Sequence, residues 1–288
     1  MASTTPVKPG LKTVLVTGCS SDGIGYALAE AFADSGYHVF ATARDLSKAK
    51  DLEKHPSGNI QLMQLDVTSP ESIKACVGAV GLATEDRGLD VLVNNAGAVQ
   101  TMPLLDVDLA KARQLYDVNV WGLLAVAQGF ADLLIKAGGV LLNVASIAAC
   151  VTQSWQGIYN SSKAAVTMLS ETLRLEMAPL GVRVITAMVG VVGTKIFVNS
   201  GEFVLPPGSR YKSVEKEIGK QSRGEELFGH MDTKTVAKRL LGDVTAGRSG
   251  MVWRGGLATT TGYLSWLLPT WLLDWAGNSM TGVYKVKA

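Results

Sequence analysis

Tyr159 and Lys163, four residues apart, are the pair in this sequence best suited to acid–base chemistry. They open the stretch 159–175, whose apolar residues recur on a helical period, so both side chains would lie on one helix face, one turn apart. A free phenol has a pKa of about 10, and a nearby ammonium favours the phenolate and lowers that pKa. Because such a pair is more often a packed tyrosine beside a solvated lysine, the rest of the chain must decide its role.

A serine hydroxyl thirteen residues before Tyr159 could complete this chemistry. Ser146 follows the apolar run 140–144, which has the composition of a buried strand. Ligands of open α/β sheets bind outside the carboxyl ends of the strands, so a hydroxyl at this point could bind a substrate carbonyl oxygen.

Asn119 lies inside the apolar part of a long, broken helix predicted at 108–135. A buried amide needs hydrogen-bond partners. Its amide could bond to nearby backbone, or its backbone carbonyl or side chain could hold a water molecule that links Lys163 to solvent.

The elements that would position these residues alternate between apolar strands and helices. This order predicts a parallel sheet with helices on both faces, an α/β fold of the doubly wound Rossmann type. Because no linker or internal repeat interrupts residues 11–195, we expect a single domain. The predicted strands are 12–17, 37–43, 60–65, 89–93, 140–144, 182–188 and 249–253, and the predicted helices are 26–35, 71–84, 108–135, 159–175 and 232–243.

The first strand runs into a glycine-rich turn at 18–25 and then into a helix. Glycines let a backbone approach a pyrophosphate, and a helix N-terminus offers N–H donors and a positive dipole end. A tight packing turn would also need glycines, and the Asp22 carboxylate would oppose a phosphate unless it points outward or caps the helix. The cofactor contacts expected here are Gly18, Ser20, Ser21, Gly23 and Gly25.

Arg44 follows the second strand, where dinucleotide folds place an acidic residue on the ribose 2′-hydroxyl. An arginine suits a 2′-phosphate instead, because its planar fork matches phosphate geometry. With Ser21 and Thr42 as helpers, it favours NADP(H) over NAD(H), although surface arginines are also common after strands.

The ends of three more predicted strands should border the expected cofactor site. Asp66 could accept from an adenine amino group or belong to the cap of the next helix, because residues 68–71 form an N-cap signature. The two amides and two small residues at 94–97 suit a close backbone approach to a cofactor. The contacts expected at these ends are Asp66, Val67, Asn95, Ala96, Gly97, Val189 and Gly190.

Composition narrows the function classes. The chain has 288 residues, 47% of them hydrophobic, and a formal net charge of +2 without a basic run, which gives no case for a nucleic-acid partner. Its three cysteines form no metal-spaced pair, so we expect no metal site and a reducing, cytoplasmic compartment. The start is polar and lacks the apolar segment of a secretion signal.

Taken together, these motifs resemble the short-chain dehydrogenase/reductase family. They stand in the family's order over about 180 residues. A looser likeness, carried by the longer glycine turn, residues 40–44 and residues 251–256, is to a fungal branch similar to acyldihydroxyacetone-phosphate reductase. Val189 stands where the family usually has proline, and Ala145 where it often has serine. The matching residues are Thr17, Gly18, Gly23, Ile24, Gly25, Asp66, Val67, 94–97, Asn119, Ser146, Tyr159, Lys163, Gly190 and Thr194.

The resemblance implies a sheet of about seven parallel strands and a homo-oligomer. It also implies a catalytic tetrad of Asn119, Ser146, Tyr159 and Lys163. The expected reaction is NADPH-dependent reduction of a carbonyl on an apolar or lipid-like small molecule. A reductase of a secondary-metabolite pathway would carry the same tetrad, and a non-redox regulator or scaffold that binds NADP(H) is the alternative from another class. The resemblance further implies dinucleotide contacts from Ile24, Asp66, Asn95, Lys163, Val192 and Thr194.

The two ends of the domain are less regular. We expect a flexible tail at 1–10, a Rossmann domain at 11–256 and, within it, a substrate lid at about 195–232, rich in Gly, Pro and charge. The apolar, tryptophan-rich segment 257–288 could wall a substrate pocket, form a subunit interface or, through residues 257–275, contact a membrane such as endoplasmic reticulum or lipid droplets.

Overall fold

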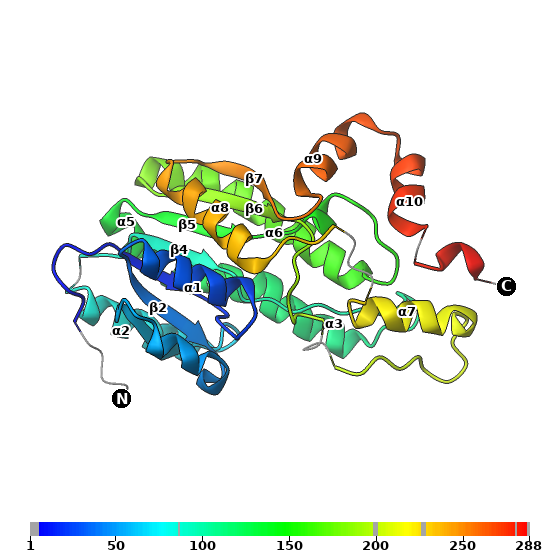
Figure 1. Ribbon diagram of the computed structural model, residues 1–288, viewed down its shortest axis with the longest axis horizontal. Helices are drawn as coiled ribbons and strands as arrows, with labels where there is room; N and C mark the ends of the chain where they lie inside the picture. The colour runs from blue at the N-terminus through cyan, green and yellow to red at the C-terminus, as the bar shows by residue number, and fades with distance from the viewer. Residues whose placement is uncertain (1–5, 86, 198–200, 226–228, 280, 287–288) are drawn as a thin grey trace.

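Seven parallel strands form one sheet in the order β3-β2-β1-β4-β5-β6-β7, which confirms the expected doubly wound α/β fold (Figure 1). The computed structural model describes residues 6–85, 87–197, 201–225, 229–279 and 281–286. The strand order reverses between β1 and β4, and ligands of such sheets bind beside that switch point. The strands are β1 (Thr13–Val16), β2 (His38–Ala43), β3 (Ile60–Gln64), β4 (Val91–Asn94), β5 (Val140–Val144), β6 (Arg183–Val189) and β7 (Gly250–Arg254).

Helices cover both faces of the sheet because the strand side chains alternate between two buried clusters. Val14 and Val16 pack with α1 and α8, which contact each other, whereas Leu15 packs with α2, α4 and α5. The α-helices are α1 (Ile24–Asp34), α2 (Pro70–Ala83), α3 (Leu109–Tyr116), α4 (Leu123–Gly129), α5 (Ala131–Ala137), α6 (Gly157–Met177), α7 (Glu215–Ser222), α8 (Thr233–Thr245), α9 (Ala258–Leu267) and α10 (Thr270–Asn278). Short helical turns are η1 (Leu46–Lys54), η3 (Ile147–Ala149), η4 (Ala178–Leu180), η6 (Lys212–Val214) and η7 (Val283–Lys285), and η2 (Asp117–Gly122) is a π-helix.

The long helix predicted at 108–135 is broken, as expected, and the break has a defined form. It consists of α3, the π-helix η2, α4 and α5. A π-helical turn places an extra residue in the helix, and such turns are frequent at functional sites. Asn119 lies within η2.

Two regions hold helices that the sequence pattern did not predict. The expected lid contains η6 and α7, while residues 198–200 and 226–228 of that lid lie outside the described residues. The tryptophan-rich segment forms α9 and α10, separated at Pro269, and Figure 1 shows this bent pair at the edge of the molecule beyond β7. Residues 1–5 of the expected tail and residues 280, 287 and 288 of the C-terminal segment are also outside the described residues.

No single helix among the described residues is long and apolar enough to cross a membrane. The pair Leu109–Gly129 and Ala131–Ala137, bent by 52°, meets the requirement jointly by length and composition. Val126 and Leu134 of this pair, and Phe130 between the two helices, are fully buried in the protein core.

Candidate active site

Strand β5 and helix α6 bring Ser146 and Tyr159 together. Ser146 follows the end of β5 and caps η3, where its Oγ accepts a hydrogen bond from the Ala148 N–H at 3.1 Å. Tyr159 lies in the first turn of α6, and its hydroxyl forms a hydrogen bond with the Ser146 side chain. The two groups that the sequence assigned to a substrate oxygen therefore contact each other at the carboxyl end of the sheet.

Lys163 lies one turn further along α6 and is buried. Its Nζ donates to the carbonyl oxygen of Val144 at 3.0 Å and lies 5.9 Å from the centroid of the Tyr159 ring. Burial lowers the pKa of Lys163 to about 8. A Cβ placed on Gly97 would lie 3.7 Å from this Nζ, so the loop after β4 runs beside the ammonium.

The pKa of Tyr159 differs from the expectation that Lys163 would lower it. Burial raises this pKa, and the hydrogen bond with Ser146 lowers it by a smaller amount, so its pKa lies above the ordinary value. Desolvation disfavours the charged phenolate more strongly than its neighbours favour it. The tyrosine is thus held as a neutral phenol, the form that can donate a proton.

Asn119 is buried, and its whole side chain is occupied by protein groups. Its Oδ1 accepts from the Ala98 N–H at 2.7 Å, and its Nδ2 donates to the Ala98 carbonyl at 2.9 Å and to Ser162 Oγ at 3.0 Å. Ser162 in turn donates to the Tyr159 carbonyl at 2.7 Å. The side chain therefore clamps the loop after β4 to the first turns of α6. Of the two alternatives for the Asn119 side chain, these contacts support a core amide that bonds to nearby backbone.

Thr17 joins the glycine-rich turn to the loop after β4. Its Oγ1 accepts from the N–H groups of Asn95 and Ala96, each at 2.9 Å. Asn95 Nδ2 donates back to the carbonyls of Thr17 at 2.8 Å and Gly18 at 3.1 Å. Gly18 has φ +73°, and a Cβ there would lie 2.9 Å from Ala96 Cα, so only glycine permits this close approach. The Asn95 amide thus holds the glycine-rich turn against the loop after β4.

The N-terminus of α1 remains open to an anion. Its N-cap, Gly23, offers no side-chain cap, and the first turn has no acidic residue. Asp22, which the sequence flagged as opposing a phosphate, forms an ion pair with Lys195 at 2.5 Å. The carboxylate is therefore directed to the segment that follows β6.

The expected 2′-phosphate helpers have other partners. The Ser21 hydroxyl and N–H both bond the Lys48 carbonyl, at 2.7 and 2.8 Å, and the buried Thr42 hydroxyl donates to the Val16 carbonyl at 3.0 Å. Arg44 remains exposed at the end of β2. The tether through Ser21 places Lys48, a cation that the sequence pattern did not single out, beside the glycine-rich turn.

Asp66 at the end of β3 forms a local turn. Its Oδ1 accepts from the N–H and hydroxyl of Thr68, and these bonds hold the pKa of Asp66 below its usual value. The cap of α2 is Ser69, whose side chain accepts from the Ser72 N–H. The neighbouring Val67 is half-buried against the core that contains α2 and α4.

The loop after β6 passes close to the chain after β7. Val191 exchanges two backbone hydrogen bonds with Gly256, and Gly190 donates to the Arg254 carbonyl at 2.8 Å. A Cβ on Gly190 would collide with the Gly256 carbonyl, so this position also requires glycine. Val189 and Val192 are buried, and Thr194 directly precedes the ion-paired Lys195.

These residues fit a nicotinamide dinucleotide. An uncapped helix N-terminus and two glycine-lined loops meet at the switch point, which is the arrangement that accepts a pyrophosphate. A buried ammonium and a hydrogen-bonded Ser–Tyr pair lie at the neighbouring strand end. No group of three or more His, Cys, Asp or Glu side chains suited to a metal ion occurs within the described residues.

Comparison with known proteins settles the family. The short chain dehydrogenase model matches residues 12–204, two thirds of the chain, a span that contains the matching residues from Thr17 to Thr194. The chain belongs to the short-chain dehydrogenase family. It is 43% identical to short-chain dehydrogenase ptmH of Penicillium ochrochloron, over 94% of this chain and 98% of that protein.

A further fungal relative and a solved structure are also similar to this chain. The NADPH-dependent 1-acyldihydroxyacetone phosphate reductase of Schizosaccharomyces pombe is 38% identical, over 75% of this chain and 73% of its own length. A crystal structure of a short-chain dehydrogenase from Streptomyces avermitilis superposes with a TM-score of 0.78 at 26% identity, covering 93% of this chain and 97% of that one. The fungal resemblance seen in the motifs is thus confirmed.

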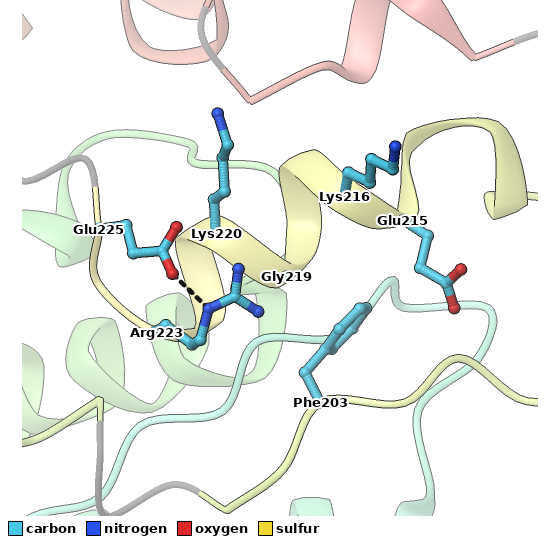
Figure 2. Close-up of a pocket in the computed structure, with 7 residues that line it drawn as sticks. All are labelled: Phe203, Glu215, Lys216, Gly219, Lys220, Arg223 and Glu225. Carbon is cyan, nitrogen blue, oxygen red and sulfur yellow. Dashed lines mark hydrogen bonds and ion pairs between the residues drawn. The ribbon is translucent and has the colours of Figure 1, made fainter.

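The segment expected to form a lid contains a surface hollow (Figure 2). It lies along α7, and its lining includes Phe203, Lys216 and the Arg223–Glu225 ion pair, but none of the four tetrad residues. Figure 2 shows Lys216 and Lys220 extending from the far side of α7 relative to Phe203. The hollow is therefore separate from Ser146 and Tyr159 and belongs to the surface of segment 195–232.

The segment α9–α10 exposes its tryptophans. Trp266, Trp271 and Trp275 are 89%, 70% and 61% exposed. Side chains so open to solvent do not wall an enclosed pocket, so the pocket interpretation of these three residues loses support, and the interface and membrane interpretations stay open.

Proposed function

We propose that this dehydrogenase is an NADPH-dependent reductase that converts a carbonyl on an apolar or lipid-like small molecule into an alcohol. The hydrogen bond between Ser146 and Tyr159, with the buried Lys163 ammonium one turn below, carries the proposal. This arrangement presents two hydroxyl donors to one substrate oxygen and a cation behind them. The NADPH, when bound, supplies the hydride, and everything else is done by side chains of this chain.

Ser146 donates a hydrogen bond to the substrate carbonyl oxygen and stabilises the negative charge that develops on it. Tyr159 delivers the proton to that oxygen, and its raised pKa keeps it protonated for this step. Lys163 holds positive charge near the phenol and presents donors toward the cofactor ribose. Asn119 keeps α6 and the loop after β4 in register. Ser146 and Tyr159 thus act on the reacting oxygen, and Lys163 and Asn119 support them.

The preference for NADPH rests on Arg44. It is an exposed guanidinium at the end of β2, with Lys48 held nearby through Ser21. A 2′-phosphate suits such a site, and an acidic residue that would select NADH is missing at position 44. The name of the Schizosaccharomyces pombe relative, which is NADPH-dependent, supports the same choice.

The apolar substrate class rests on the lid and on the same relative, whose name specifies an acylated phosphate ester as substrate. Within the lid, Leu205, Val214 and Ile218 are buried, so an apolar surface continues from the body of the protein into this segment. A closing lid of this kind excludes water from the reacting groups.

The test is NADPH oxidation by wild-type protein and by Tyr159→Phe with a panel of aliphatic and acylated ketones. The variant should bind NADPH with wild-type affinity and lose roughly 1000-fold in kcat, because general acid catalysis contributes about 100- to 10,000-fold. Wild-type protein that binds NADPH and reduces none of the ketones would favour the non-redox alternative. A variant that keeps the wild-type kcat would remove Tyr159 from the mechanism.

A further inference from the structure

The loop between Ser146 and Tyr159 is held by donors from four separate parts of the chain. Its four consecutive backbone carbonyls, residues 152–155, each accept a hydrogen bond from a different segment. Such a loop has little freedom to move, because each peptide is fixed independently. The donors are Asn278 Nδ2 to Thr152 at 2.9 Å, Asn160 Nδ2 to Gln153 at 3.0 Å, Gln221 Nε2 to Ser154 at 3.1 Å and the Met102 N–H to Trp155 at 2.6 Å.

Asn278, at the end of α10, holds this loop with both its amide oxygen and its amide nitrogen. Its Oδ1 accepts from the Ser154 N–H at 2.7 Å and from Ser154 Oγ at 2.6 Å. Its Nδ2 donates to Thr152 and also to the Asp274 carbonyl at 2.9 Å. The residue is only 4% exposed, so the amide has exchanged all its water contacts for this loop and its own helix.

Trp155 shows why the loop needs such support. It has φ +68°, in the left-handed region that a bulky side chain rarely adopts. Conformations of this kind persist where the surroundings over-determine them. The indole N–H donates to the Thr281 carbonyl at 2.8 Å, and the ring packs against Val214 and Ile218 of the lid. The lid and the C-terminal segment therefore meet on this one side chain.

We propose that Asn278 is a positioning residue for the reaction: it braces residues 152–155 and thereby fixes Ser146 and Tyr159 at hydrogen-bonding distance. The inference rests on the proposed reductase function and adds the C-terminal segment to its machinery. Ser146 and Tyr159 are the flanks of the braced loop, so a shift of its peptides changes their separation. A misplacement of about 1 Å in a catalytic site can cost roughly 100-fold in rate.

The test compares Asn278→Ala with Trp271→Ser, a change on the same helix at a side chain that is 70% exposed. Asn278→Ala should lower kcat about tenfold or more and leave the KM for NADPH within about twofold of wild type, because the loop holds catalytic groups and not the dinucleotide. Trp271→Ser should change neither. In the direction of alcohol oxidation, where the phenolate is needed, loss of the Ser146 bond should move the rising limb of the pH profile to higher pH.

Asn278→Asp covers the case in which the alanine variant does not fold. The carboxylate keeps the acceptor for Ser154 but can no longer donate to the Thr152 carbonyl. It should show the same split between kcat and KM, with a smaller loss in kcat.

Amide hydrogen exchange gives a readout that does not depend on turnover. The Ser154 N–H should exchange faster in the Asn278 variants than in wild type and Trp271→Ser. Unchanged exchange at Ser154, or a kcat within about twofold of Trp271→Ser, overturns the brace. If wild-type protein reduces no ketone, the proposed function fails, and the exchange measurement alone decides whether Asn278 holds the loop.

Discussion

The Lys163 ammonium donates to the carbonyl oxygen of Val144 at 3.0 Å, which ties helix α6 to the end of strand β5. The hydrogen bond between Ser146 and Tyr159 joins the same two elements a few residues further on. Two bonds between one strand end and one helix set the mutual orientation of the phenol, the hydroxyl and the ammonium. Burial of the ammonium comes with this arrangement, and it lowers the pKa of Lys163 to about 8.

Replacing Lys163 by Met should weaken the rise of the free energy of unfolding with pH between about pH 8 and 10.5. The folded-state pKa of about 8 lies below the ordinary value of 10.5, so between these pH values the unfolded chain binds more protons. The contribution of Lys163 to the free energy of unfolding therefore rises as pH increases through this window, by on the order of 3 kcal/mol. Urea denaturation of wild type and Lys163→Met at pH values on both sides of the window measures it. Equal slopes in the two proteins would show that the lysine does not titrate there.

Arg44→Asp should shift the coenzyme preference from NADPH toward NADH. The introduced carboxylate repels a 2′-phosphate and can accept from a 2′-hydroxyl, so NADPH should bind roughly tenfold or more weakly and NADH more tightly. Fluorescence titration with both coenzymes measures the two Kd values. Arg113→Asp, an exposed arginine on α3, is the matched control for the added negative charge. An unchanged ratio of the two Kd values would remove Arg44 from coenzyme selection.

The sequence predicted the elements better than it predicted the tasks of individual side chains. Periodicity and strand-end motifs located all seven strands and placed Ser146 and Tyr159 at one edge, since parallel strands bring their carboxyl ends together. The side-chain amides of Asn95 and Asn119 bond to the protein backbone, and the contacts of these two residues with a cofactor or a water stay predictions. A motif identifies such residues without revealing which neighbours their amides meet.

The sequence pattern did not predict contacts between distant parts of the chain. Asn278 meets Ser154 across 124 residues, and Trp155 meets the Thr281 carbonyl across 126 residues. No local spacing encodes such pairs. The helix α7 within the expected lid was also missed. Its residues combine charge with three buried positions, Ile218, Gly219 and Ser222, and only Ile218 is a large apolar residue, which is too few for a clear helical period.

Asn119→Ala should destabilise the protein and slow the reaction together. The change leaves the half-buried N–H and carbonyl of Ala98 without their partner and removes a donor to the buried Ser162. An unsatisfied buried group costs about 1–3 kcal/mol and a half-buried group costs less, so the free energy of unfolding should fall by roughly 1–3 kcal/mol. Because Ser162 bonds the Tyr159 carbonyl, kcat should fall as well. Urea denaturation and steady-state kinetics measure the two effects, and a stable variant with wild-type kcat would contradict the clamp.

The ion pair between Asp22 and Lys195 should matter for coenzyme binding more than for stability. Both side chains are about 60% exposed, and exposed pairs contribute little to folding. The pair, however, joins the glycine-rich turn to the segment after β6, and it neutralises the carboxylate nearest the N-terminus of α1. Lys195→Met leaves that carboxylate uncompensated beside the pyrophosphate site, so the Kd for NADPH should rise roughly threefold or more at low salt.

A second change separates this electrostatic effect from loss of the lysine itself. Adding Asp22→Asn to Lys195→Met removes the uncompensated charge, and asparagine tolerates the left-handed φ of +62° at position 22. The double variant should therefore bind NADPH nearly as tightly as wild type. Added salt should reduce the defect of Lys195→Met, since exposed charges are screened over about 10 Å at 0.1 M ionic strength. If the single and double variants have the same Kd at low salt, the Asp22 carboxylate does not act on the bound coenzyme.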